Sequence, residues 1–292
     1  MNSLNPVAST RSAWLQGFIG VLIFSASLPA TRLALQGFSP LFLTAARALL
    51  AALCAGLMLI VWRQSRPDTR DWRSLCWVAL GVVAGFPLLT AWALQTISAA
   101  HSVVFVALLP LSTACFAVWR AAERPKPLFW LSAAGGSLVV ILFAWQTDSR
   151  VNWQGNLLML LAIALCGLGY AEGAQLSRRL GGWQVICWAL LLAAPVMSML
   201  ALCTWPDSWP SATSPAWLGL AYVAVFSMLL GFVFWYRGLA QGGIARIGQL
   251  QLLQPFLGLL LAHWLLGEVL QSAMIYASGL IVLSVWFARR YA

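Results

Sequence analysis

Charged residues are scarce in this 292-residue chain: 8% of its residues are Asp, Glu, Lys or Arg, whereas 62% are hydrophobic. A soluble domain carries about 25% charged residues, so a soluble fold of this composition would lack a polar surface. Acidic residues are the rarest, with 7 Asp and Glu against 17 Lys and Arg. The composition excludes an ordinary soluble protein and indicates that lipid is the solvent.

Motifs for catalysis, nucleotide binding and metal binding are also missing. The sequence has no GxSxG, HExxH or Walker motif, and no pair of aspartates lies within an apolar run. These absences argue against an intramembrane enzyme and against an ATP-driven pump. The six cysteines lie inside apolar runs and form no CxxC pair, so we expect neither a metal site nor disulfides. We expect no cofactor, and the net charge of +10 comes with no nucleic-acid motif.

Long apolar runs are what the chain does have, and a helix needs about 20 such residues to cross the hydrocarbon. Most of the 17 tryptophans lie near the ends of these runs, as in an interfacial aromatic belt. The sequence therefore predicts ten membrane-spanning helices. Their ranges are Trp14–Leu35, Pro40–Trp62, Trp72–Gln95, Ser98–Trp119, Pro125–Trp145, Trp153–Ser177, Trp183–Trp205, Pro215–Tyr236, Ile244–Gly267 and Leu270–Ala288.

Basic residues alternate sharply between successive loops. The loops of one side hold Arg11, Arg63, Arg66, Arg70, Arg73, Arg120, Arg124, Lys126, Arg178, Arg179, Arg237, Arg246, Arg289 and Arg290. The loops of the other side hold Arg150 alone, while Arg32 and Arg47 fall within spans. Because cytoplasmic loops carry the excess of Lys and Arg, we expect both termini in the cytoplasm.

The two halves of the chain resemble each other when the sequence is shifted by 145 residues. Between Ala93 and Glu123, seven of 31 positions are then identical. These pairs are Leu94/Leu239, Ala100/Ala245, Leu108/Leu253, Pro110/Pro255, Ala117/Ala262, Trp119/Trp264 and Glu123/Glu268. A unit of five spans is odd, so the second copy enters the membrane from the opposite side. This predicts an all-α integral membrane fold of two inverted-topology five-helix repeats, residues 1–148 and 149–292, an arrangement that suits alternating access.

Several motifs resemble those of the drug/metabolite transporter superfamily, in particular ten-helix proteins of the EamA type. They are the Leu-Leu-Pro-Leu of 108–111, the Leu-Gln-Pro-Phe of 253–256, the Leu-Gly-Glu of 266–268, the Ser-Leu-Pro-Ala-Thr-Arg of 27–32 and Arg47. The resemblance covers nearly the whole chain. It implies an inner-membrane exporter of amino acids or related metabolites, and YddG-like aromatic amino-acid exporters are one branch of the superfamily. No motif fixes that branch.

Polar residues at membrane depth are few, and they define the candidate substrate site. A proline within a helix leaves the carbonyl four residues earlier without its N–H partner, so Pro29, Pro110 and Pro255 predict kinks. A buried amide costs several kcal/mol unless it is paired, so Gln251 and Gln254 should face the bundle interior. The predicted substrate-binding residues are Ser25, Ser27, Tyr170, Gln251, Gln254 and Arg47.

Structural readings compete with functional ones at these positions. Ser25 and Ser27 could bond to their own helix. Arg47, about 10 Å into its helix at 1.5 Å per residue, could extend to the outer interface or attract a substrate carboxylate. Glu172, the one acidic residue inside a span, could pair with Arg178 or Arg179 or relay protons.

The sequence as a whole favours a secondary transporter that exports neutral or aromatic amino acids, or related metabolites, across the inner membrane. Alternatives are an exporter or exchanger of nucleobases or organic cations, a membrane assembly protein, and an intramembrane enzyme. The expected partners are a small-molecule substrate and membrane lipids, with no nucleic acid. The oligomeric state, monomer or homodimer, stays open.

Overall fold

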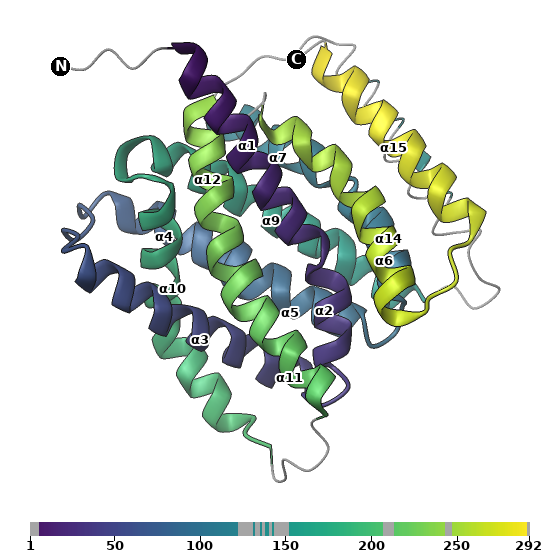
Figure 1. Cartoon of the computed structure of the whole chain (residues 1–292), viewed down its shortest axis with the longest axis horizontal. Helices are drawn as coiled ribbons and strands as arrows, with labels where there is room; N and C mark the ends of the chain where they lie inside the picture. Colours follow the sequence, from purple (N-terminus) through teal and green to yellow (C-terminus); the bar gives the residue numbers. More distant parts are fainter. Residues whose placement is uncertain are drawn as a thin grey trace.

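The structure, a computed structural model, describes residues 6–121, 152–206, 213–242 and 247–290, with a few single positions between 131 and 142. Every regular element in these ranges is helical (Figure 1). The first four spans are α1 (Pro6–Ser25) with α2 (Ser27–Ala34); α3 (Pro40–Val61); α4 (Asp71–Val78), η1 (Ala79–Gly85) and α5 (Phe86–Ala93); and α6 (Ala99–Val106) with α7 (Leu109–Ala121). The later spans are α9 (Trp153–Leu180); α10 (Gly182–Cys203); α11 (Ser214–Ala221), η2 (Tyr222–Leu230) and α12 (Gly231–Gly242); η3 (Gly248–Leu253) with α14 (Gln254–Leu266); and α15 (Ser272–Arg290).

Seven helices in the described ranges are long and apolar enough to cross a membrane. The stretches Gln254–Leu266 and Ser272–Ser284 are apolar but shorter. The fifth predicted span, Pro125–Trp145, lies almost wholly outside the described residues. The chain is thus an all-helical integral membrane protein, and ten spans remain a prediction. Two boundaries differ clearly from expectation. Helix α1 begins at Pro6, ahead of the predicted Trp14, and the eighth span continues past Tyr236 to Gly242 and includes Arg237.

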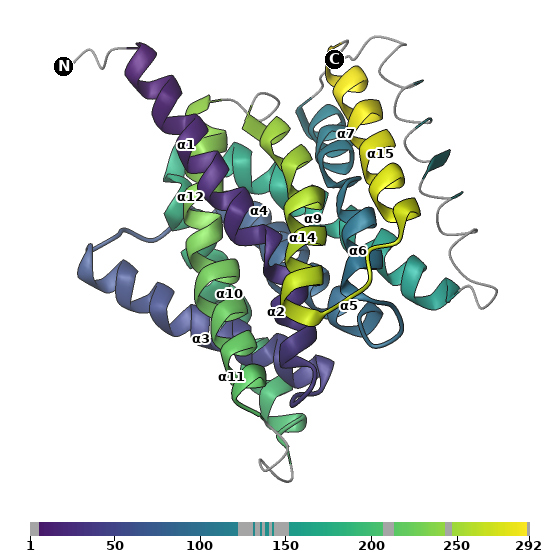
Figure 2. The same cartoon turned by 45° about the vertical axis from the view of Figure 1, so that its right-hand side comes forward.

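The two halves interleave. Helix α1 of the first half packs along α12 of the second half, and α9 of the second half packs against α4, η1 and α5 of the first. Helices α3 and α10 form a third long contact between the halves. Figures 1 and 2 show α1 beside α12, with α15 at the edge of the bundle. These central spans of each half therefore pack against spans of the other half.

Glycines allow two of these crossings to be close. A Cβ on Gly81 in η1 would lie 2.5 Å from the Leu165 carbonyl oxygen and 2.9 Å from Gly169 Cα. A Cβ on Gly238 in α12 would lie 2.9 Å from the backbone nitrogen of Gly17 in α1. In lipid, the hydrophobic effect does not drive helices together. Membrane helices associate instead through van der Waals packing, which small residues strengthen because they let two backbones approach closely.

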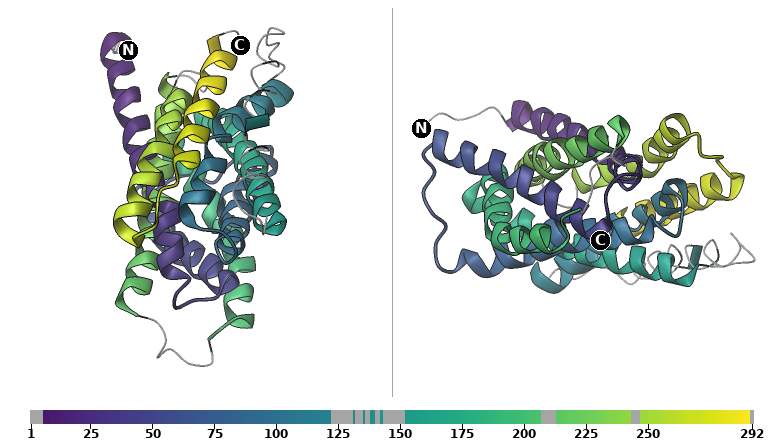
Figure 3. Two further views of the ribbon diagram at one scale, coloured as in Figure 1. Left: turned by 90° about the vertical axis from the view of Figure 1, so that its right-hand side faces the viewer. Right: turned by 90° about the horizontal axis from the view of Figure 1, so that it is seen from below.

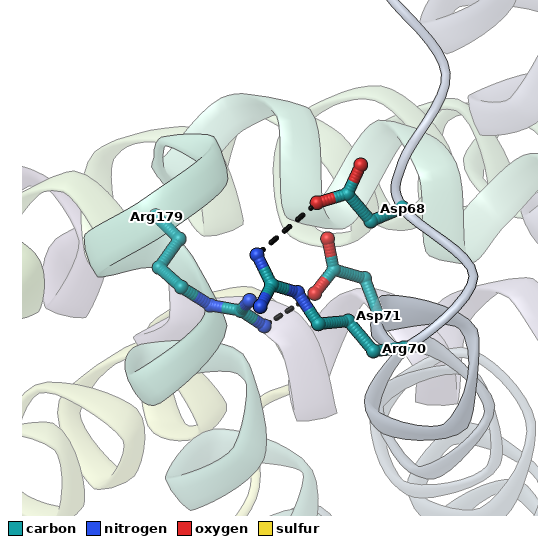
Figure 4. Close-up of polar contacts among 4 residues, drawn as sticks. All are labelled: Asp68, Arg70, Asp71 and Arg179. Atoms are coloured by element: carbon teal, nitrogen blue, oxygen red, sulfur yellow. Dashed lines mark hydrogen bonds and ion pairs between the residues drawn. The ribbon is translucent and has the colours of Figure 1, made fainter.

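Side-chain contacts join loops that the charge pattern assigns to the same side. At the predicted outer ends of the spans, Arg32 donates to the Leu94 carbonyl, and Glu268 accepts from the backbone N–H groups of Ala99 (3.0 Å) and Ala100 (2.7 Å). Among the predicted inner segments, Arg179 at the end of α9 pairs with Asp71 at the start of α4 (Figure 4). The start of α1 and the end of α15 lie at one end of the bundle (Figure 3).

Cysteine labelling can test the predicted orientation of the loops in the membrane. In a background without the six native cysteines, Arg70→Cys should resist a membrane-impermeant maleimide in intact cells and react after permeabilisation. Arg150→Cys should react in intact cells, because its loop is predicted outside. Labelling of the cysteine at position 70 from outside would contradict the orientation.

Departures from α-helical geometry recur at positions related by the repeat. A shift of 145 residues places η1 onto residues 224–230, which lie in η2, and both segments are π-helical. The same shift places the start of α7 onto the start of α14, with Pro110 and Pro255 each at the second residue of its helix. Short π-helical stretches often mark functional sites, and here they flank the centre of the bundle.

A candidate substrate site between the two halves

A small cavity lies at the centre, between the halves. It is lined by Phe24, Ser27, Leu28, Arg47, Val82, Phe86, Pro87, Val106, Leu109, Cys166, Tyr170, Ser227, Phe232 and Gln254. These residues come from the first four spans and from the sixth, eighth and ninth. The cavity volume is about 20 Å³, enough for about one water molecule. The conformation is therefore closed, and helices must move apart before a larger solute can enter.

Arg47 supplies the one formal charge in the cavity lining. Helix α3 starts at Pro40, with Ser39 as its N-cap, and carries this arginine inward until it is only 5% exposed. Its Nη2 donates to the Ser227 hydroxyl at 3.4 Å, whereas its Nε has no hydrogen-bond partner. Among the described residues, no carboxylate lies within ion-pair distance of it. A buried guanidinium in this state attracts an anion strongly.

Two hydroxyls connect the arginine to the first span. Ser27 at the start of α2 and Ser227 in η2 hydrogen-bond to each other. Ser227 thus contacts Ser27 and Arg47 together, joining three spans at one point of the cavity wall. Val82, the repeat counterpart of Ser227 in η1, also lines the cavity, so both π-helical segments contribute a side chain.

Gln254 forms another polar part of the wall. It begins α14, directly before Pro255, and is 8% exposed. Its Oε1 is buried without a hydrogen-bond partner. Its repeat counterpart, Leu109, lines the cavity as well. In each repeat, therefore, the residue directly before the proline lines the central cavity. Because one counterpart is leucine and the other glutamine, the cavity wall is apolar at the first-repeat position and polar at the second-repeat position.

Aromatic rings close the remaining side. Phe24, Tyr170 and Phe232 all line the cavity. The Phe24 and Phe232 ring centroids are 5.0 Å apart, and those of Tyr170 and Phe232 are 5.8 Å apart. Trp235 packs behind them, 5.9 Å from the Tyr170 ring. Such a wall accepts apolar or aromatic groups and also favours cations over its ring faces.

The structure brings four of the six predicted substrate-binding residues to one cavity and places the other two outside it. Ser27, Arg47, Tyr170 and Gln254 line one cavity. Ser25 does not line it, because its hydroxyl bonds to the Val21 carbonyl of its own helix at 2.7 Å.

Gln251 is buried but lies outside the lining, and its Nε2 has no hydrogen-bond partner. Its carbonyl is not left free by Pro255, because the 3₁₀ turn of η3 lets the Gln254 N–H bond to it. The chain breaks at Ala26, between α1 and α2, and Pro29 follows as the third residue of α2. Pro110 likewise follows a turn, which separates α6 from α7.

Glu172 lies in α9, two residues after Tyr170, and is 2% exposed. It does not line the central cavity. Arg179, one of its two expected partners, pairs with Asp71, a residue that the sequence gave no reason to single out. Ser227 was visible only as a polar residue near the middle of its span, and its part in holding Arg47 depends on packing.

The sequence profile of the EamA-like transporter family matches residues 11–145 and again residues 153–290. The chain belongs to the EamA-like transporter family. Its two family units correspond to the two repeats, and the protein is a membrane transporter.

Several curated proteins are similar to this EamA transporter along most of its length. The "Uncharacterized transporter YdeK" of Bacillus subtilis (strain 168) is 57% identical over 283 residues, covering 97% of this chain and 99% of that protein. The "Probable terminal-alkyne amino-acid exporter" of Streptantibioticus cattleyicolor is 21% identical, covering 92% and 91%. A solved crystal structure matches with a TM-score of 0.69 at 20% identity, covering 95% of this chain and 97% of the other, which supports the fold.

Proposed function

We propose that this EamA transporter exports amino acids, with broad preference for neutral and aromatic ones, by alternating access across the inner membrane. The observation that carries the proposal is the buried Arg47, which faces the central cavity with no carboxylate partner among the described residues. A substrate carboxylate would supply the missing anion through a charge-assisted hydrogen bond. Similarity to a probable amino-acid exporter agrees with this chemistry.

The remaining walls suit the rest of a zwitterionic amino acid. Gln254 offers an unpaired amide oxygen that can accept from an ammonium group. Phe24, Tyr170 and Phe232 give an apolar surface for the side chain. Few polar groups contact that surface, so selection among side chains would rest on size and apolar contact, which discriminate weakly.

The buried Arg47 also bears on the alternative substrates, organic cations and nucleobases. A fixed positive charge at the centre disfavours organic cations, because like charges in a low-dielectric site repel strongly. Nucleobases remain the second candidate, since the aromatic wall and the Gln254 amide suit a planar heterocycle.

The test is a flux screen in proteoliposomes with amino acids, nucleobases and organic cations, with and without a pH gradient. We expect counterflow of neutral and aromatic amino acids and none of organic cations. Flux of nucleobases alone would replace the proposed substrate class, and chemical turnover without flux would indicate an enzyme.

Gln254→Leu tests the second polar contact. The change keeps similar bulk and removes the amide, so apparent substrate affinity should fall by about 5- to 150-fold, the equivalent of roughly 1–3 kcal/mol. Counterflow at several substrate concentrations measures it. Leu109→Ile, at the repeat counterpart, is the matched control and should change affinity less than about 3-fold. Unaltered affinity in a well-folded Gln254→Leu protein would make that residue a packing residue.

Glu172 is proposed as the proton-coupling group, because ionisable groups buried at membrane depth often take part in proton relays. Glu172→Gln should then abolish flux driven by a pH gradient while counterflow exchange continues. Ser177→Ala, another buried change on the same helix, should leave both activities. Normal gradient-driven flux in Glu172→Gln would assign the carboxyl a structural role.

A further inference from the structure

A second cavity lies at the end of the bundle that carries the basic residues, and it shares no lining residue with the central cavity. Its volume is about 560 Å³, much larger than that of the central cavity. The end of α9, the start of α10 and the end of α12 enclose it, and it opens to the surface. The proposed transport function uses none of its residues.

Two arginines from different helices line this cavity: Arg178 from α9 and Arg237 from α12. Both are exposed, and within the described ranges neither forms an ion pair. The adjacent Arg179 differs, because it pairs with the buried Asp71, as Figure 4 shows. The cavity therefore has two positive groups available for a ligand.

The start of α10 adds positive polarity to the same wall. The helix follows Gly181, whose φ of +97° turns the chain sharply, and no side chain caps its first N–H groups. Gly181, Gly182, Trp183 and Gln184 all line the cavity. The N-terminus of this 22-residue helix is thus part of the wall of the cavity that the two arginines line.

Tryptophan rings indicate the depth of the cavity. Trp183 lines it and packs edge-on against Trp62, the residue after α3, with ring centroids 5.0 Å apart. Tryptophans at the ends of spans lie at the level of the lipid headgroups. The positive groups are therefore placed where headgroup phosphates lie, and not out in the aqueous phase.

We infer that this cavity binds the phosphate of an anionic phospholipid from the leaflet facing the basic side. Arg178 and Arg237 would hold the phosphate oxygens, and the N–H groups at the start of α10 would complete the contact. Basic pockets between helices on the cytoplasmic side are known as a general type of anionic-lipid site. Because the cavity joins spans of the second half only, lipid binding would stabilise that half independently of substrate.

The experiment is native mass spectrometry of delipidated full-length protein, titrated with phosphatidylglycerol or phosphatidylcholine. The unaltered protein should prefer phosphatidylglycerol. Arg178→Gln and Arg237→Gln should each weaken its binding about 5-fold, and the double variant about 25-fold. The matched control is Arg11→Gln with Arg73→Gln, which removes two exposed charges from the same predicted side outside the cavity. It should change binding less than 2-fold.

Three outcomes would overturn the inference. Equal losses in the control pair would indicate diffuse charge attraction. Full retention of phosphatidylglycerol by a folded Arg178/Arg237 double variant would exclude the site. Displacement of the lipid by millimolar inorganic phosphate would identify a site for soluble anions. Thermal unfolding of each variant in detergent separates lipid loss from misfolding.

Discussion

Arg47→Gln should weaken the binding of carboxylate substrates by about 30- to 4,000-fold, the equivalent of roughly 2–5 kcal/mol. Glutamine removes the charge but keeps a polar side chain, although it is too short to keep the 3.4 Å hydrogen bond from the end of the arginine to Ser227. Substrate affinity in proteoliposome counterflow is the measurement. The loss should shrink for substrate analogues in which an amide replaces the carboxylate, because those never used the charge.

Two controls separate a substrate contact from a structural role. Arg47→Lys keeps the charge but not the planar fork of donors, so it should retain part of the affinity. Arg32→Gln removes the other arginine that the sequence placed within a span. Arg32 donates to the Leu94 carbonyl and does not line the cavity, so this change should leave affinity within about 3-fold. If Arg47→Gln binds carboxylates and their amides with unchanged affinity, Arg47 is not the carboxylate contact.

Gly81→Ala should destabilise the protein by about 3 kcal/mol or prevent its accumulation in the membrane. The new methyl would lie 2.5 Å from the Leu165 carbonyl oxygen and 2.9 Å from Gly169 Cα, which are backbone atoms with no rotamer to change. Relief requires η1 and α9 to separate, and these elements carry Val82 and Tyr170 to the cavity. Thermal unfolding in detergent measures the loss.

Gly56→Ala is the matched control in α3. Its new methyl would lie 3.6 Å from a Leu191 side-chain carbon, an ordinary contact, so stability should change by less than about 1 kcal/mol. Equal stabilities of the two variants would contradict the close crossing of the third and sixth spans.

The sequence predicted the helical membrane fold and the repeat because both leave local signals: apolar length, loop charge and the recurrence of Pro110 at Pro255. It also pointed to four residues that meet at one cavity, because buried Gln and Arg side chains are costly anywhere else in lipid. Ser25 and Gln251 show the limit of that reasoning. Both are buried polar residues, but the direction of each side chain depends on how its helix is rotated by its neighbours. The π-helical η2 left no signal at all, since no proline lies within Tyr222–Leu230.

The interleaving of the halves has a consequence for biosynthesis. Helix α1 leaves the ribosome first, yet its partner α12 lies about 200 residues later in the chain, as the bond between Ser27 and Ser227 illustrates. At a synthesis rate of about 5–20 residues per second, α1 waits roughly 10–40 s in the bilayer with its glycine face turned to lipid. The first four spans therefore cannot complete their packing as an independent early intermediate. A nascent chain that is truncated before the eighth span should present unpaired small-residue faces to the machinery that removes incomplete membrane proteins.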